Sequence, residues 1–247
     1  MLSKCGEVRV HHWAHHARRH CDRWWEPETD WHREWKNHFP MEWQEVIHHN
    51  PDGERHVADV RTGNGLVIEF QHSHLSPAER RKRETSYGNM VWVVDGARLS
   101  GDRPRFINGV RTLQATGLRG FCAHLDPQDC FPKNWVNSSK LVLFDFGRDP
   151  ENVSSNDTVS NLWCLLPGRA DGRVIFGALP RSEFVRLAIE RPYILQAEKI
   201  VTLLDQHYRD LRLQRAQAMM QSYQKVSTTS RHPLWNMRWR RKRWRRW

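Results

Sequence analysis

The sequence contains no apolar run that approaches the roughly 18 residues needed to cross a membrane. Its opening residues also lack the apolar core of a secretory signal peptide. Hydrophobic residues make up 38% and charged residues 27% of the 247 residues, as is typical of soluble globular proteins. We therefore expect a cytoplasmic protein that can bury a real core, as one large domain or two small ones.

Cysteine is scarce, and its pattern excludes a small disulfide-stapled fold. There are five cysteines, an odd number, and their spacing matches no disulfide framework. Free thiols or metal ligands are therefore favoured. Cys122 and Cys130 lie close to His124 in the sequence, and this spacing could indicate a metal site. Because no Cys-x2-Cys pair is present there, we favour ordinary loop cysteines.

Acidic residues are absent from the last part of the chain, where residues 231–247 contain eight Lys or Arg. Tryptophans alternate with these cations, and that mixture is typical of segments that bind a nucleic-acid backbone and stack on bases. An anionic membrane surface or a disordered tail without a dedicated ligand are the alternatives, and we favour DNA. We expect this tail, residues 226–247, to be disordered before it binds. Its predicted DNA-binding residues are Arg238, Arg240, Arg241, Lys242, Arg243, Arg245 and Arg246.

Residues 57–73 predict a β-hairpin and form the most informative stretch of the chain. Two β-branched runs flank Gly63-Asn64-Gly65, whose glycines supply the positive φ that a tight reversal requires. If these three residues form the loop, Asp59 lies directly opposite Glu69. Cross-strand neighbours are about 5 Å apart at Cβ, and two carboxylates that close repel each other unless a cation lies between them. The pattern predicts a site for a hard divalent cation, and the alternative is two acids on a solvated face.

An aspartate, a turn and then Glu-x-Gln at the end of an apolar strand resemble the PD-(D/E)xK nuclease superfamily. The stretch is more closely similar to the nuclease-like domain of the competence protein CoiA family. The similarity covers about residues 5–96 of this chain. The segments that carry it are His12-Trp13-Ala14-His15, Glu28, His32, Lys36, Ala58-Asp59-Val60, Ile68 to Ser73, Leu75-Ser76, Glu79, Arg83, Tyr87 and Val91 to Val94.

The resemblance implies an α/β fold with a restriction-endonuclease-like core, in which helices flank a mixed sheet. A C-terminal α+β extension would follow this core. The resemblance also implies hydrolysis of phosphodiester bonds that depends on Mg²⁺ or Mn²⁺. In this chain Asp59 and Glu69 would be direct metal ligands, helped by the Phe70 carbonyl, and Glu28 would be a further carboxylate beside the metal.

Gln71 stands where most of the nuclease superfamily has a lysine, although the CoiA-like pattern itself has glutamine there. An amide cannot act as a base, but it can hold a water molecule by hydrogen bonds. The identity of the general base is therefore left open. Lys36 on the first helix could take this role, and His72 or His74 could assist.

The Cys/His-rich residues 1–21 resemble the small zinc-binding element with which CoiA-like proteins often begin. In those proteins a Cys-x2-Cys pair precedes the His-aromatic-Ala-His motif, but here the first cysteine of that pair falls at Leu2. The element is therefore degraded or truncated. A tetrahedral Zn²⁺ site could still form, and the alternative is a histidine-rich arm without metal. The candidate ligands are Cys5, His12, His15 (or His16) and Cys21.

The pattern of apolar residues predicts the order α-β-β-β-α-β for the nuclease-like core. The expected elements are a helix at 24–38, strands at 43–48, 55–61 and 66–72, a helix from Ser76 and a buried strand at 90–95 parallel to the hairpin. Later strands are expected at 141–146, 162–166 and 173–178, and helices over 181–225 with a break near Pro192. The predicted divisions are the N-terminal segment 1–21, the core 22–98, a β-rich extension 99–180, the helical region 181–225 and the tail.

The helix that begins at Ser76 is strongly basic. A charge run is usually a solvated face, but this helix starts just after the carboxylate strand and could hold phosphates. We predict DNA contacts from Arg80, Arg83 and Tyr87.

These features together favour a metal-dependent DNA nuclease, CoiA-like, that acts in DNA uptake, recombination or defence. The alternative is a catalytically silent DNA-binding accessory protein of recombination or competence. A membrane-associated protein directed by its tail is a weaker third reading. DNA is the expected partner, together with recombination or defence proteins, and the sequence leaves the oligomeric state open.

Overall fold

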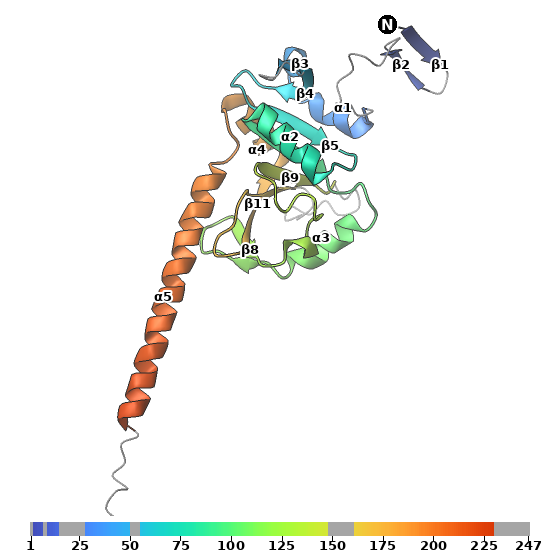
Figure 1. The fold of residues 1–247 in the computed structure, drawn as a ribbon. Coiled ribbons are helices and arrows are strands. Elements are labelled where there is room, and N and C mark those ends of the chain that lie inside the picture. The colour runs from blue at the N-terminus through green and yellow to red at the C-terminus, as the bar shows by residue number, and fades with distance from the viewer. Residues whose placement is uncertain (1, 7–8, 15–27, 50–54, 148–160, 230–247) are drawn as a thin grey trace, which may run out of the picture.

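The computed structural model describes residues 2–6, 9–14, 28–49, 55–147 and 161–229 (Figure 1). Its strands are β1 (Leu2–Gly6), β2 (Arg9–Ala14), β3 (Gln44–His49), β4 (Arg55–Arg61), β5 (Val67–Gln71), β6 (Met90–Asp95), β7 (Gln114–Ala115), β8 (Phe121–His124), β9 (Leu141–Asp145), β10 (Asn161–Leu165) and β11 (Val174–Pro180). Its helices are α1 (Asp30–Lys36), α2 (Pro77–Tyr87), α3 (Asp102–Val110), α4 (Arg181–Glu190) and α5 (Ala197–Thr229), with short 3-10 turns η2 (Met41–Trp43) and η3 (Pro127–Asp129).

Over the described ranges the chain forms a large mixed sheet flanked by helices, which confirms the α/β class. In the part of the chain that the structure describes, this sheet has nine strands in the order β3-β4-β5-β6-β9-β10-β11-β8-β7, and β1 and β2 form a separate antiparallel pair. Both faces of the central strands are covered, and β5 and β9 are buried along their whole length.

The predicted meander and the strand after it are confirmed. β3 pairs antiparallel with β4, and β4 with β5. β5 then runs parallel to β6, and β6 runs parallel to β9. A parallel connection requires a crossover, which α2 provides between β5 and β6. The later strands predicted from the apolar runs correspond to β9, β10 and β11.

Two layers of buried side chains lie on opposite faces of the sheet. Ile68 and Phe70 belong to the layer that α1, α4 and the first turns of α5 cover. Val67 and Trp92 belong to the layer that α2 and α3 cover (Figure 1). The strand β5 therefore separates α1 from α2, and both helices can place side chains at its end.

The first helix begins at Asp30, later than the predicted residue 24. Thr29 is its N-cap: the Thr29 hydroxyl accepts the backbone N–H of His32 at 3.3 Å, and the His32 ring accepts the backbone N–H of Thr29 at 3.3 Å. This is a capping box that histidine closes in place of the usual Glu or Gln, so the sequence pattern did not reveal it. Glu28 consequently precedes the helix and does not continue the stripe of His32 and Lys36.

The predicted boundary between residues 98 and 99 does not divide the sheet. Strands from β7 to β11 continue the same sheet beyond β6, and α3 covers one face. Cys122 lies in strand β8, and the ring of His124 bonds to Thr112 (2.8 Å) and to the Asp126 N–H (2.8 Å). The ring nitrogens of His124 are therefore engaged in hydrogen bonds, and the metal reading of this segment gains no support.

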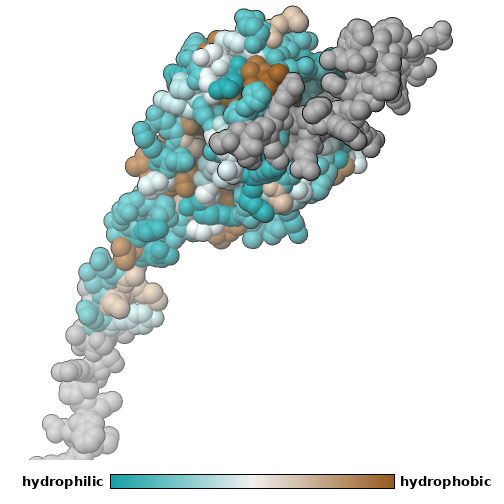
Figure 2. Space-filling model, turned by 45° about the horizontal axis from the view of Figure 1, so that its top comes forward, coloured by the Kyte–Doolittle hydropathy of each residue, from teal (hydrophilic) through white to brown (hydrophobic). Residues whose placement is uncertain are grey.

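The predicted helical region corresponds to α4 and α5, which are separated around Pro192. α5 continues past the predicted end to Thr229 and projects away from the sheet (Figure 1). The side chains described from Arg212 to Gln224 are all exposed. The face drawn in Figure 2 is mainly hydrophilic, with small separate hydrophobic areas. Among the described helices, none is long and apolar enough to span a membrane.

Candidate functional site at the separation of β4 and β5

The structure brings the two predicted carboxylates together. The loop closes as expected, because the Thr62 N–H donates to the Leu66 carbonyl at 2.9 Å, and Val60 pairs with Ile68. The next position along this register sets Asp59 opposite Glu69. The backbone N–H of Asp59 lies 3.4 Å from Oε1 of Glu69, and the Asp59 carboxylate is close enough to raise the pKa of Glu69 by its charge.

The strands β4 and β5 separate at this point, and side chains replace their ladder. In a regular antiparallel pair, Ala58 and Phe70 would form the next hydrogen-bonded pair. Instead the Phe70 N–H donates to Oδ2 of Asp59 at 2.8 Å, and the Phe70 carbonyl lies 2.7 Å from Nε2 of His32. Ala58 and Val60 also pack in opposite core layers, so the alternation of β4 is interrupted at Asp59.

No separate role at this site was predicted for His32, yet its ring engages the Phe70 carbonyl that was predicted to help hold the metal. Its Nδ1 accepts the backbone N–H of Thr29, so Nε2 carries the proton that it donates to the Phe70 carbonyl. The side chain is 6% exposed. The capping box of α1 thereby orients the His32 ring, which bonds to the Phe70 carbonyl where β4 no longer pairs with β5.

The two carboxyl groups are held in a state that disfavours ionisation. Burial raises the pKa of Asp59, and the Phe70 N–H and the charges of His32, Lys36 and Arg83 oppose this shift. Burial and then the neighbouring charge of Asp59 raise the pKa of Glu69 to about 8. A cation beside both groups would reverse these shifts, because it favours the ionised form.

The cations of the site come from both faces of the sheet. Arg83 on α2 lies 3.4 Å from Glu69 and 2.8 Å from Glu79, and the Tyr87 side chain also bonds to Glu69 and lowers its pKa. Lys36 on α1 is buried and pairs with Glu28 and with Glu45 (3.0 Å). The resulting pKa of Lys36 is raised: burial lowers it, but the hydrogen bonds and charges of the two glutamates outweigh burial.

Lys36 and Glu28 therefore differ from their predicted roles. A lysine whose pKa is raised stays protonated at neutral pH and is a poor general base. Glu28 forms ion pairs with Lys36 and with Arg33 (3.7 Å) and does not join the carboxylate pair. Within the described part of the chain, no group of three or more His, Cys, Asp or Glu side chains converges as metal ligands.

The donor set at the separation is thus two carboxylates, and it suits Mg²⁺ better than a cation that needs a full protein cage. Mg²⁺ usually keeps several waters and binds proteins through one or two carboxylates. The raised pKa values show that negative charge at Asp59 and Glu69 is under-compensated. Gln71 lies on β5, the strand that carries Glu69. It is 2% exposed, and its amide donates to the Ser73 carbonyl at 3.3 Å.

Arg80, predicted to contact DNA, is a structural residue. Its side chain is 2% exposed, donates to the carbonyls of Asn134 and Asn137 (2.7 Å) and pairs with Glu84 at 3.1 Å. Arg83 and Tyr87 are also buried, and both contact the carboxyl group of Glu69. The basic helix α2 therefore turns part of its charge inward, because the segment after η3 covers it.

The zinc and tail predictions fall mainly on residues that the structure does not describe. Cys5 and His12 lie in β1 and β2, where only the backbone is described, and His15 and Cys21 lie outside the described residues. The tail arginines from Arg238 onward lie outside them as well. The zinc ligands, the Mg²⁺ ligands Asp59 and Glu69, and the DNA contacts of the tail therefore stay predictions.

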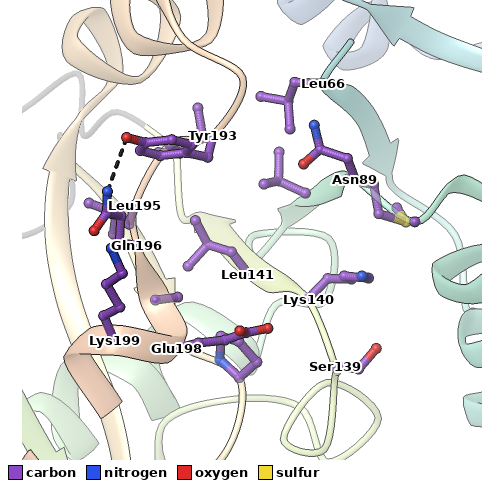
Figure 3. Close-up of a pocket in the computed structure, with 16 residues that line it drawn as sticks. Leu66, Asn89, Ser139, Lys140, Leu141, Tyr193, Leu195, Gln196, Glu198 and Lys199 are labelled. Carbon is purple, nitrogen blue, oxygen red and sulfur yellow. Dashed lines mark hydrogen bonds between the residues drawn. The ribbon is translucent and has the colours of Figure 1, made fainter. Parts of the chain in front are cut away.

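A separate cavity of about 300 Å³ lies at the opposite ends of the parallel strands (Figure 3). Met90 and Leu141, the first residues of β6 and β9, line it, and Lys140 lies beside them. On its other side Gln196 donates to the Tyr193 hydroxyl at 3.1 Å. None of the side chains predicted for the carboxylate site lines this cavity.

Replacing Glu69 by glutamine is expected to remove a pH dependence of stability. The folded protein holds the Glu69 proton up to about pH 8, whereas an unfolded glutamate releases it near pH 4.5. The free energy of unfolding therefore falls as pH rises between these values, by about 1.4 kcal/mol for each pKa unit at most. Urea unfolding at pH 5 and pH 8 should show a loss on the order of 2–4 kcal/mol in the metal-free wild type and a clearly smaller loss in the Glu69→Gln variant.

The exposed Glu34 provides the matched control for this measurement. Glu34→Gln should keep the wild-type pH dependence. If Glu69→Gln also keeps it, the carboxyl group of Glu69 is not held protonated in the folded protein.

Comparisons with known proteins add no assignment: no protein-family model matches the chain, and no curated protein or solved structure matches it. The class that the fold defines is α/β, with a large mixed sheet flanked by helices.

Proposed function

We propose that this protein is a metal-dependent nuclease that hydrolyses phosphodiester bonds of DNA. The observation that carries the proposal is the meeting of Asp59 and Glu69 where β4 leaves β5, with both pKa values raised. A divalent cation would favour the ionised form of both groups, and Mg²⁺ held by two carboxylates keeps further coordination positions for water and a phosphate. The resemblance to the CoiA-like nuclease domain points to the same two residues.

Asp59 and Glu69 would hold Mg²⁺ or Mn²⁺, which when bound polarises a phosphate and lowers the pKa of a coordinated water. Arg83 holds Glu69 in position from α2. His32 and Asp59 satisfy the backbone of Phe70 and keep the strands apart. Gln71 lies two residues beyond Glu69, on the same side of β5, where its amide could hold a water by hydrogen bonds.

The direct test titrates Mg²⁺ and Mn²⁺ into purified protein with supercoiled plasmid and with single-stranded DNA. We expect nicks or fragments that require the metal and disappear with chelator. A chain that leaves both substrates intact at every metal concentration would overturn the proposal.

A second candidate function is DNA binding without hydrolysis, and the specific observation in its favour is the lack of a lysine base. Gln71 replaces that lysine, and Lys36 is engaged by two glutamates. The same titration separates the two candidates, because a silent accessory protein binds DNA and gives no product.

The tail leads to a prediction about salt. If the eight cations of residues 231–247 contact phosphates, the slope of log K against log salt for single-stranded or duplex DNA should reach about −6 to −7. A chain that ends at residue 229 should show a much shallower slope, and fluorescence anisotropy at 50–300 mM salt measures both. Equal slopes for the two chains would contradict a nucleic-acid-binding tail.

A further inference from the structure

The outer half of α5 presents an exposed apolar face. The inner half packs on the sheet through Leu204, which is 4% exposed, and Arg212 still pairs with Asp171 at 2.9 Å. Beyond this ion pair the helix projects away from the sheet (Figure 1), and the side chains from Leu213 to Gln224 are all exposed. The large apolar side chains of this segment are Leu213 (60% exposed), Met219 (58%), Met220 (71%) and Tyr223 (65%).

These apolar side chains share one side of the helix with Ala216. Because each residue advances an α-helix by about 100°, the five positions fall within an arc of roughly 120°, the width of an amphipathic stripe. The stripe that packs on the sheet is a different one, since Leu204 lies roughly 160° around the helix axis from Met220. The exposed face is therefore a second apolar face of α5 and not a continuation of its contact with the core.

The charge of this segment is low for a helix that is surrounded by water. Arg215 is the one charged residue between Leu213 and Gln224. A solvated helix usually carries charged side chains, and a helix of about 12–15 residues without tertiary contacts is only marginally stable in water. We therefore expect another helix to cover the apolar face, and two copies of this segment can approach each other with little repulsion.

The spacing of the face is the same when the helix is read in reverse. Leu213, Ala216, Met220 and Tyr223 are separated by three, four and three residues, which is the spacing of a two-helix seam. If a second copy runs antiparallel about residue 218, Leu213 of one copy lies opposite Tyr223 of the other. Ala216 then lies opposite Met220, so each contact pairs a smaller side chain with a larger one and the seam can fill without voids.

The charge of the tail favours the antiparallel orientation over the parallel one. Residues 231–247 contain eight Lys or Arg and no acid. Parallel helices would bring two such tails to the same end of the dimer, where like charges repel. In the antiparallel arrangement the two copies of residue 229 are about 33 Å apart along the helix axis, several times the screening length of about 8–10 Å in physiological salt.

We propose that the outer half of α5 is a dimerisation surface whose partner is the same segment of a second copy, antiparallel and centred near residue 218. The interface is isologous, because the twofold axis places the same face on both sides. Four seam positions per helix make a small contact, so we expect a weak dimer with a Kd on the order of 10 µM. The dimer carries its two basic tails at opposite ends, and the inference does not depend on the proposed hydrolysis.

Sedimentation equilibrium of the full-length protein tests the surface. The wild type should change from monomer to dimer between about 1 and 200 µM protein. Met220→Lys should raise the Kd at least tenfold, because it places a charge in the apolar seam. Ser222→Lys adds the same charge on the opposite side of the helix and should stay within twofold of wild type. A wild type that is monomeric throughout this range, or a Met220→Lys variant that dimerises as the wild type does, would overturn the proposal.

Disulfide cross-linking tests the orientation of the two helices. We expect a mixture of Leu213→Cys and Tyr223→Cys chains to form a covalent dimer on mild oxidation, because these positions face each other in the antiparallel pair. Either variant alone should give no more dimer than the wild type, whose five native cysteines set the background. In that arrangement the two copies of residue 213 are about 15 Å apart along the axis, too far for a disulfide. Cross-linking of each variant with itself would show parallel helices and would overturn the antiparallel dimer.

Discussion

Replacing Asp59 by asparagine is expected to lower metal-dependent cleavage of plasmid DNA by a factor on the order of 10³ or more. The substitution removes one of the two charges that would hold the cation. It keeps an oxygen that can accept the Phe70 N–H, which now bonds to Asp59 at 2.8 Å. The strands should therefore separate as before, and the variant should fold.

The control is Asp210→Asn, an isosteric change on the exposed part of α5. It should cleave DNA as the wild type does. Both variants should bind DNA with wild-type affinity, because the predicted contacts of the tail are untouched. Equal cleavage by Asp59→Asn and the wild type would remove Asp59 from the metal site and leave the hydrolysis proposal without its main residue.

The second large effect is expected at Arg80, on stability rather than on DNA binding. Glu84 is buried and bonds to Arg80 (3.1 Å), to the hydroxyl of Ser138 (2.6 Å) and to the indole of Trp92 (3.3 Å). Removing the guanidinium leaves this carboxylate without its charge partner. A buried pair broken in this way costs about 3–5 kcal/mol, so Arg80→Met should lower the free energy of unfolding by that amount.

Two further variants separate charge from packing at this position. Arg81 is the exposed neighbour on α2, and Arg81→Met should stay within about 0.5 kcal/mol of wild type. The double change of Arg80→Met with Glu84→Gln removes the unpaired charge and should be more stable than Arg80→Met alone. Urea unfolding measures all three, and an Arg80→Met variant with wild-type stability and weakened DNA binding would contradict the structural role.

The hairpin and its register could be predicted because the determinants are local. A glycine-bounded loop between two β-branched runs fixes which residues face each other, and the observed pair of Val60 with Ile68 follows from it. The parallel strand β6 was equally clear, since its apolar run is nearly uninterrupted and α2 precedes it with a serine cap and a proline.

The partners of the site residues could not be predicted, because they come from distant parts of the chain. The bond from His32 to Phe70 spans 38 residues and that from His72 to Asp95 spans 23. The buried carboxylate of Asp145 forms an ion pair with Arg181 and accepts hydrogen bonds from two indole N–H groups of α1. No local pattern of charge or hydrophobicity encodes such contacts, which depend on how the sheet brings β5, β6 and β9 together.

The errors about charge have the same origin. The basic run of α2 suggested a solvated, DNA-facing helix, but burial of Arg80 and Arg83 depends on the segment after η3 and on Glu69. Glu28 was assigned to a helical stripe, and the Thr29 cap sets the start of α1 after it. In both cases the sequence indicated the charge of the residue, but only the fold shows which way its side chain points.

The most direct test of the central claim is a crystal structure of the protein with Mn²⁺, with anomalous scattering recorded at the manganese edge. The account predicts one strong peak within ligand distance, about 2.1–2.3 Å, of carboxylate oxygens of both Asp59 and Glu69. A peak elsewhere, or none beside these carboxylates at millimolar Mn²⁺, would contradict a metal centre at the separation of β4 and β5.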